Sequence, residues 1–267
     1  MTNVLFGQDT SLYKKLALLE YGIDFKNDKY GILKDSGQVK YKYDTLVYPR
    51  HTEYYFALQQ GNWGVVDKQD QVIISFEYEM IAKTWYNNFT GVDTFIVQKN
   101  NYLGTVDFQG KTVIPFKYDG ISGWCENGPR AHYVIKDKKF GLIKHDGTII
   151  IPTIYDAIHY YGPSIIKVKS GEKFGIINAK NNEIIPVVYE SIIVDFNYSD
   201  LPVSEDHQDK YVVLKNGTWS YIDENGELIQ NNVSQEIIEK EYAEFQLTHY
   251  DLTYTNYCMI KKIKNNR

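Results

Sequence analysis

Cysteine is scarce in this chain of 267 residues, which has only Cys125 and Cys258. Two cysteines cannot form a disulfide scaffold or a four-cysteine zinc site. The six histidines are scattered, with no His-x-x-x-His or Cys-x-x-Cys spacing to bring two metal ligands together. The sequence therefore predicts no metal site, no cofactor and no catalytic residues.

Long apolar runs are also absent. No uncharged apolar stretch approaches the roughly 18 residues that a membrane-spanning helix needs. The first residues, Met-Thr-Asn-Val-Leu-Phe-Gly, lack the basic start and the apolar stretch of a secretory signal. We expect a cytoplasmic protein that does not enter a membrane.

An excess of basic charge is missing too, because 29 Lys and Arg residues stand against 34 Asp and Glu residues. Nucleic-acid-binding domains normally carry a basic face, so the net charge of −5 argues against nucleic acid as a partner. Hydrophobic residues make up 43% of the chain, which is enough for a buried core.

Aromatic residues, in contrast, are abundant, with 24 Tyr, 12 Phe and 4 Trp. Aromatic side chains favour β-strands and recognition surfaces. Several of them belong to a repeated pair in which a large apolar residue precedes glycine, at intervals of 33 to 45 residues. The copies are Tyr30-Gly31, Trp63-Gly64, Leu103-Gly104, Phe140-Gly141, Phe174-Gly175 and a degenerate Trp219-Ser220.

The residues around each copy keep a strict register, counted here from the glycine. Two positions on lies an aliphatic residue, and eleven on lies a proline in three copies. Fourteen on lies a tyrosine followed by an acid in four copies, and the shorter first copy has the same pair two residues earlier. Six positions on lie residue types that tolerate the left-handed backbone of a tight turn. These turn residues are Gly37, Asp70, Gly110, Gly147, Asn181 and Gly226.

Each copy predicts a small β-meander. A strand such as 165–169 leads through a tight turn to the glycine-bearing strand, and a third strand such as 149–151 ends at the proline. A fourth segment, such as 191–194, follows the tyrosine and the acid, whose carboxylate we expect to accept turn amides. The glycine-bearing strand is apolar on both faces, which predicts burial on both sides. The predicted tight turns are Gln60-Gly61-Asn62, Asn100-Asn101, Ser170-Gly171 and Asn216-Gly217.

Segments 138–156 and 61–67, which contain Phe140-Gly141 and Trp63-Gly64, resemble the bacterial WG (KWG) repeat. The resemblance covers about residues 20–230, and Leu103, Ser220 and the short first copy depart from the motif. It implies an all-β repeat scaffold and carries no catalytic residue onto this chain.

The predicted fold is all-β, an array of about six antiparallel β-meander repeats with helical caps at both ends. An open twisted stack and a six-bladed, propeller-like ring both suit such repeats, and the unequal spacings favour the open stack. We expect an N-terminal cap over residues 1–22, six WG-type repeats over 23–230, and a helix-and-strand cap over 231–267.

The caps are predicted from local patterns at the two ends. Leu12, Leu16 and Leu19 have helical spacing before a stop at Gly22. Residues 234–245 place Ile237, Ile238, Tyr242 and Phe245 on one helical stripe behind a Ser234 cap, and 252–260 resembles a strand.

Recognition is expected where the copies differ, in the connections that follow the tyrosine and the acid. These connections are rich in aromatics, namely Tyr48, Tyr54, Tyr55, Trp85, Tyr86, Phe89, Trp124, Tyr133, Tyr160, Tyr161, Phe196 and Tyr198. Some of these side chains could instead complete the core between repeats. Asp195, Asp200, Glu205, Asp206 and Asp209 make the longest connection acidic, which suits the steering of a basic partner or simply a solvated face.

The partner-binding residues predicted from these features are Trp85, Tyr86, Phe89, Trp124, Tyr160, Tyr161, Asp195, Asp200, Glu205, Asp206 and Asp209. The first hypothesis for function is a non-enzymatic, cytoplasmic protein-binding scaffold, monomeric when free. Specifically, it would be an inhibitor or immunity-type protein that masks a toxin or an enzyme. The second hypothesis is a module that binds carbohydrate or cell-wall fragments through its aromatics. The third is an enzyme that uses Cys125 with a nearby histidine, His132 or His159, although a lone cysteine is more commonly an inert filler.

Overall fold

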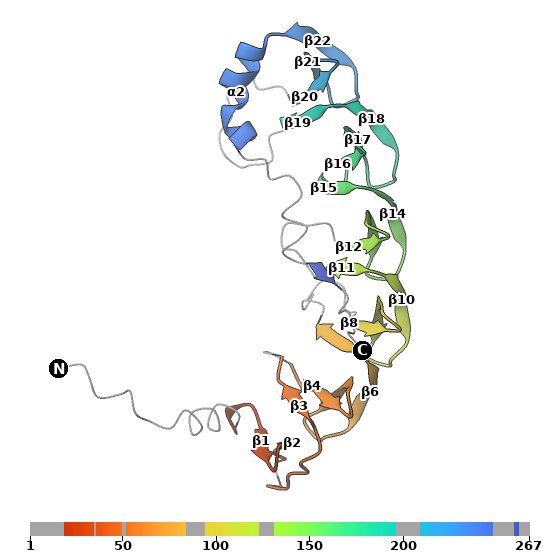
Figure 1. Cartoon of the computed structure of the whole chain (residues 1–267), viewed down its shortest axis with the longest axis vertical. Coiled ribbons are helices and arrows are strands. Elements are labelled where there is room, and N and C mark those ends of the chain that lie inside the picture. The colour runs from red at the N-terminus through yellow and green to blue at the C-terminus, as the bar shows by residue number, and fades with distance from the viewer. Residues whose placement is uncertain are drawn as a thin grey trace, which may run out of the picture. The chain divides into compact units, whose positions relative to one another are not determined.

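The computed structural model describes residues 19–34, 36–49, 52–83, 94–122, 131–195, 209–247 and 259–261. These residues form six antiparallel sheets and one long helix, α2 (Gln235–Leu247), so the all-β prediction is confirmed (Figure 1). The described residues divide into two compact units, which meet in the chain between Lys117 and Tyr118.

Unit 1 contains three sheets, the first of which has only two strands, β1 (Ile23–Lys26) and β2 (Lys29–Ile32). The second sheet consists of β3 (Thr45–Val47), β4 (Tyr54–Gln59), β5 (Asn62–Asp67) and β6 (Val72–Tyr78). The third consists of β7 (Met80–Lys83), β8 (Thr94–Lys99), β9 (Tyr102–Asp107) and β10 (Thr112–Tyr118).

Unit 2 also contains three sheets. The first consists of β11 (Gly120–Ser122), β12 (Ala131–Lys136), β13 (Lys139–Lys144), β14 (Ile149–Tyr155) and β23 (Met259–Lys261). The second consists of β15 (Ala157–Gly162), β16 (Ile165–Ser170), β17 (Lys173–Ile177) and β18 (Glu183–Tyr189). The third consists of β19 (Ser191–Asp195), β20 (Lys210–Lys215), β21 (Thr218–Ile222) and β22 (Leu228–Val233).

The glycine-bearing strand is the third strand of each complete sheet. The segment after the tyrosine and the acid was expected to finish a meander, but it begins the next sheet instead. For example, β19 pairs with β20 along its whole length, from Ser191–Leu214 to Asp195–Lys210. The repeat is therefore shifted by one strand relative to the sequence interpretation.

The tight turns follow the residue types of the repeat. All six predicted left-handed turn residues have positive φ, between 60° at Asn181 and 89° at Gly147. The second and third strands of every complete sheet are joined by two residues, as at Asn216-Gly217. Two turns differ from the prediction. Gln59 pairs with Asn62, so the turn is Gln60-Gly61 without Asn62. Ser170 pairs with Lys173, so the turn there is Gly171-Glu172.

The core lies between successive sheets of a unit. Val65 of β5 packs with Phe95 and Val97 of the following sheet, whereas the adjacent Val66 packs with residues of the preceding sheet. In unit 2, Ile176 of β17 likewise packs with residues of the following sheet, and Ile177 packs with residues of the preceding sheet. Neighbouring residues of a strand point to opposite faces. The predicted burial of this strand on both faces is thus confirmed.

The repeated glycine lies beneath a wide bulge in the fourth strand. Phe140 pairs with Tyr155 and Leu142 with Ile151, so residues 152–154 pass opposite Gly141. The expectation that the proline ends the third strand of each copy is therefore wrong, because β14 continues through Pro152. Proline lacks the N–H of a strand ladder, and at a bulge in the outermost strand of the sheet that donor is not needed.

The degenerate sixth copy supports this explanation of the glycine. Trp219 pairs with Val233 and Tyr221 with Gln230, so the bulge opposite Ser220 is one residue shorter than the others. The Ser220 hydroxyl donates to Asn231 Oδ1 at 2.8 Å. A side chain is tolerated where the bulge is smaller.

A single acidic residue carries the chain from each complete sheet to the next. Asp156 lies between β14 and β15, and its N–H donates to the Lys169 carbonyl at 2.8 Å. Its carboxylate accepts the Gly171 turn N–H at 2.8 Å, as predicted for turn amides, and pairs with Lys139 at 2.6 Å. The same backbone and carboxylate contacts to the next sheet recur at Asp44, Glu79, Asp119 and Glu190. We call these five residues the crossover acids.

The C-terminal helix covers the last sheet, as Figure 1 shows. Ser234 Oγ accepts the Ile237 N–H at 3.3 Å, and Ile238 and Tyr242 are buried against Trp219. Ile237, which was expected on the same stripe, is exposed. The final strand does not cover this end, because β23 pairs with β11 in the first sheet of unit 2.

Most of the predicted N-terminal helix lies outside the described residues. Residues 19 and 20 are helical, and the Gly22 N–H donates to the Leu19 carbonyl at 3.0 Å. Gly22 has a φ of 68°, the left-handed conformation of a residue that follows a helix.

Replacing Gly141 by alanine tests the role of the repeated glycine. A Cβ at residue 141 would lie 2.6 Å from the Ile151 carbonyl oxygen, whereas one at Gly162 would meet no atom within 4 Å. We expect Gly141→Ala to lower the free energy of unfolding by about 1–3 kcal/mol, the range for overpacking. Gly162→Ala should leave it nearly unchanged in urea denaturation. Equal effects of the two substitutions would contradict the account.

Candidate functional site

The two ends of each four-stranded sheet differ in what they carry. The hairpin end holds the two-residue turn that a crossover acid binds. The opposite end, here called the loop end, holds the connection between the first and second strands and the turn between the third and fourth. The loop-end connections span residues 48–53, 84–93, 123–130, 163–164 and 196–209. Variation in length is therefore confined to the loop end.

A pocket opens at the loop end of the first two sheets of unit 1. It has a volume of about 790 Å³, within the range of roughly 300–1,000 Å³ that is typical of ligand sites. Its lining consists of Glu20, Tyr21, Gly22, Leu33, Lys34, Ser36, Tyr48, Tyr55, Lys68 and Gln69. We call it the loop-end pocket.

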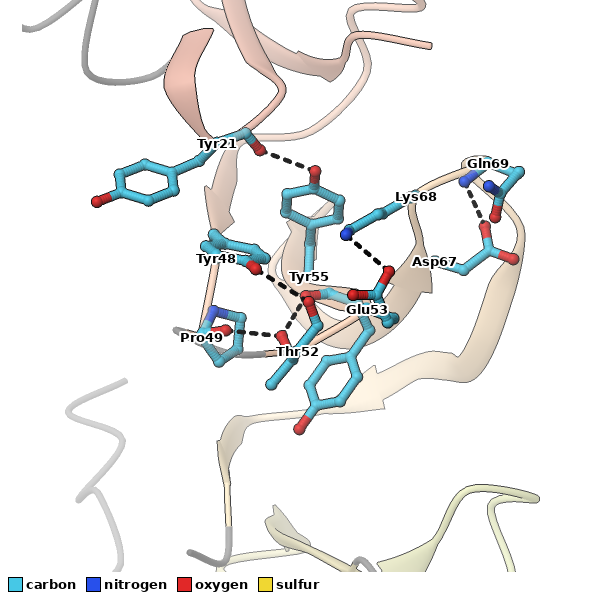
Figure 2. Close-up of polar contacts among 10 residues, drawn as sticks. Tyr21, Tyr48, Pro49, Thr52, Glu53, Tyr55, Asp67, Lys68 and Gln69 are labelled. Carbon is cyan, nitrogen blue, oxygen red and sulfur yellow. Dashed lines mark hydrogen bonds and ion pairs between the residues drawn. The ribbon is translucent and has the colours of Figure 1, made fainter. Parts of the chain in front are cut away.

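Three tyrosines form one wall of the loop-end pocket (Figure 2). Tyr21 stacks on Tyr48 with ring centroids 5.3 Å apart, and Tyr48 lies 5.6 Å from Tyr55 in a tilted arrangement. The Tyr55 hydroxyl donates to the Tyr21 carbonyl at 2.8 Å. Burial raises the pKa of Tyr55, which keeps this hydroxyl a donor.

The connection 48–53 holds Tyr48 in this wall. The Tyr48 hydroxyl donates to the Thr52 carbonyl at 3.0 Å. The hydroxyl of Thr52 lies 2.7 Å from the Pro49 carbonyl and 3.0 Å from that of Tyr54. Thr52 is buried, so these contacts fix the orientation of Tyr48 from within the protein.

Among the described residues, the charged groups that line the loop-end pocket cancel when Glu53 is included. Lys68 pairs with Glu53 at 2.6 Å, and the hydrogen bond between them raises the pKa of Lys68 (Figure 2). Glu20 and Lys34 add one charge of each sign to the lining. Within the described part of the chain neither of these two forms an ion pair, so both can meet a ligand.

Leu33 contributes an apolar side chain to the same pocket. Its counterparts in later copies, Val66 and Ile177, are buried against the preceding sheet. Leu33 is 40% exposed. An aliphatic position that serves the core in later repeats therefore serves the pocket in the first.

Most of the predicted partner-binding residues lie outside the described residues. They are Trp85, Tyr86, Phe89, Trp124, Asp200, Glu205 and Asp206. Tyr160 and Tyr161 lie on β15, where both are half-buried and pack against the cores on the two faces of their sheet. Tyr54 and Tyr133, which were among the aromatics of the connections, are buried strand residues.

Asp195 ties the C-terminal helix to the last sheet. It accepts the Tyr242 hydroxyl at 2.7 Å and pairs with Lys210 at 3.4 Å, with only 14% of its side chain exposed. Asp209 is half-buried. Within the predicted acidic segment, Asp195 therefore has a structural contact, which holds α2 against the last sheet.

The described contacts of His132 are internal to its own sheet. Its Nδ1 lies 2.6 Å from the Ser122 carbonyl and its Nε2 lies 2.8 Å from His145 Nδ1. Burial, with a smaller effect from His145, lowers the pKa of His132 to about 4. Both ring nitrogens are engaged, which leaves neither of them to serve as a base for Cys125, itself outside the described residues.

Among the described residues, no three His, Cys, Asp or Glu side chains gather to hold a metal ion. No helix in that part of the chain is long and apolar enough to cross a membrane.

The loop-end pocket was not predicted from the sequence, and none of its lining residues was among the predicted partner-binding residues. Tyr48 and Tyr55 were among the aromatics of the variable connections, but Tyr21, Lys34 and Lys68 were missed. These three come from separate turns of two repeats. All three lie at the loop end. This shared position could have been recognised from the sequence if each strand had been assigned to the correct sheet.

Comparison with known proteins gives a family match and distant structural similarities. The family model of the WG containing repeat matches residues 63–102, 104–138, 140–173 and 174–219. A search of the curated proteins finds no match.

Among solved structures, similarity is low. The biofilm matrix protein Bap1 of V. cholerae has a TM-score of 0.27 and 9% identity, over 71% of this chain and 38% of Bap1. Hsv2p of Kluyveromyces lactis has a TM-score of 0.31 and 9% identity, over 81% of this chain and 75% of Hsv2p. PorZ of Porphyromonas gingivalis has a TM-score of 0.26 and 10% identity, over 79% of this chain and 31% of PorZ. This chain thus spans well under half the length of Bap1 and PorZ.

The buried His132 predicts a pH-dependent stability. An unfolded histidine takes up a proton near pH 6.5, whereas folded His132 resists protonation down to about pH 4. Stability should be complete above pH 6.5 and fall by about 3 kcal/mol as the pH drops to 4. Urea denaturation across this range measures the loss.

The variant His132→Asn serves as the comparison. It lacks the group that titrates, so its stability should vary less between pH 6.5 and 4 even if it is lower throughout. An equally steep pH dependence in the variant would show that other groups cause it.

Proposed function

Because the chain belongs to the WG-repeat family, a non-catalytic repeat type, we propose that it is a binding scaffold that masks a partner protein in the cytoplasm. The specific form of the proposal is an inhibitor or immunity-type protein for a toxin or an enzyme. Masking an active site requires affinity alone, at a typical scale of roughly 800 Å² buried on each partner.

The contrast between the two ends of the sheets carries this proposal. At the hairpin end, the crossover acids use the repeated polar groups to join one sheet to the next. At the loop end, the connections range from the short 163–164 to the long 196–209. Binding residues occur preferentially on variable loops held by a rigid scaffold. Recognition by the loop ends follows from this division.

The residues of these connections suit a protein partner. Trp85, Tyr86, Phe89 and Trp124 belong to connections 84–93 and 123–130, and tryptophan and tyrosine dominate the energetics of protein interfaces. Asp200, Glu205 and Asp206 belong to connection 196–209 and favour a partner with a basic surface.

Isothermal titration calorimetry against the purified product of a neighbouring gene tests the proposal. We expect a complex that Trp85→Ala or Trp124→Ala weakens about 30-fold, the effect of a hot spot of about 2 kcal/mol. Tyr102→Ala is the matched control, because Tyr102 is an exposed aromatic beside the two-residue turn at a hairpin end. Absence of a complex with every neighbouring product would contradict the proposal, as would a complex that only Tyr102→Ala weakens.

Neutralising the acidic connection tests the charge of the partner. The triple variant Asp200→Asn, Glu205→Gln, Asp206→Asn should lower the association rate constant, and added salt should shrink the difference from the unmodified chain. Stopped-flow measurement at low and high ionic strength gives both values. A faster association of the variant would indicate an acidic partner instead.

A further inference from the structure

The loop-end pocket of unit 1 combines an aromatic wall with a polar, electrically balanced rim. We propose that it binds a neutral carbohydrate, with one sugar ring against Tyr21. This site is separate from the masking of a protein partner and does not depend on it.

The aromatic wall offers the apolar half of such a site. A sugar ring has a face of C–H bonds, which suits the negative face of an aromatic ring. Tyr21 is one of the residues that line the loop-end pocket, and 36% of the residue is exposed. Figure 2 shows the hydroxyl of Tyr21 directed away from Tyr55 and Lys68. The ring rather than the hydroxyl is therefore the group offered to a ligand.

The wall is oriented before a ligand arrives. Tyr48 supports Tyr21 by stacking, and Thr52 holds the hydroxyl of Tyr48. Tyr55 fixes the backbone of Tyr21 through its hydroxyl. A ring that is already held loses little freedom on binding, which favours affinity for a small ligand.

The rim supplies both hydrogen-bond donors and acceptors. Lys34 donates, Glu20 accepts, and the Gln69 amide and Ser36 hydroxyl can do both. Each sugar hydroxyl likewise donates and accepts. A purely apolar ligand would leave these four groups unpaired, at a cost in affinity.

The balance of charge among the described residues favours a neutral ligand. Lys68 is neutralised by Glu53, and the lining adds Glu20 and Lys34 with opposite signs. A strongly anionic or cationic ligand would therefore meet repulsion as well as attraction. A neutral polyhydroxylated ligand can hydrogen-bond to both the positive and the negative side chains of the lining.

The test is binding of the full chain to an array of neutral, sulfated and sialylated glycans, with the strongest neutral glycan then measured by calorimetry. Tyr21→Ala should weaken this binding at least tenfold, and Lys34→Met should weaken it severalfold. Tyr21→Phe keeps the ring and should bind like the unmodified chain. Tyr102→Ala and Lys111→Met change exposed residues of unit 1 outside the pocket and should have no effect.

Three results would overturn the proposal. The first is no binding of any neutral glycan, and the second is selective binding of charged glycans. The third is neutral-glycan binding that Tyr21→Ala leaves intact. Preference for a pool of acetylated, amidated peptides over every glycan would assign the pocket to a protein segment instead. Failure to find a protein partner would leave this result unaffected, so the two proposals are tested separately.

Discussion

The crossover acid is the contact on which the arrangement of the sheets depends. Between complete sheets the chain passes through this residue alone, and its N–H and carboxylate both bind the hairpin end of the sheet it enters. With so short a crossing, successive sheets of a unit lie face to face. Their strands can then be apolar on both sides, and each core is shared by two sheets.

The same contact gives the two ends of each sheet different roles, one structural and one available for recognition. The hairpin end is uniform because its turn must meet the carboxylate of the preceding crossing. No crossover acid binds the loop end among the described residues, and the connections there differ in length and composition from sheet to sheet. The loop-end pocket lies there, with Tyr48 from a connection and Lys68 from a turn between strands. Both proposals, the masking of a protein and the binding of a sugar, concern this end.

The repeat made much of the fold predictable from sequence. The residue types at Gly37, Asp70 and Asn181 predicted left-handed turns, because few residues adopt that backbone without strain. The assignment of strands to sheets was not predictable in the same way, because a tyrosine followed by an acid does not reveal which sheet the acid binds. Pro152 predicts a strand end, because the sequence of one strand does not reveal that a bulge removes the need for a backbone N–H at this position.

The candidate site was less predictable than the fold. Tyr21, Tyr48 and Lys68 come together only when two repeats stack, and no spacing within one repeat encodes their proximity. Asp195 shows the opposite error. Its place in an acidic stretch suggested a partner surface, whereas its contact with Tyr242 comes from a helix 47 residues away in the chain.

Amide hydrogen exchange measured by NMR tests the central claim about the crossover acids. Asp156→Ala removes the acceptor of the Gly171 N–H, and Glu190→Ala removes that of the Asn216 N–H. The account predicts that exchange accelerates at Gly171 but not at Asn216 in the first variant, and the reverse in the second. Unchanged exchange at both amides, or equal acceleration at both in either variant, would contradict it.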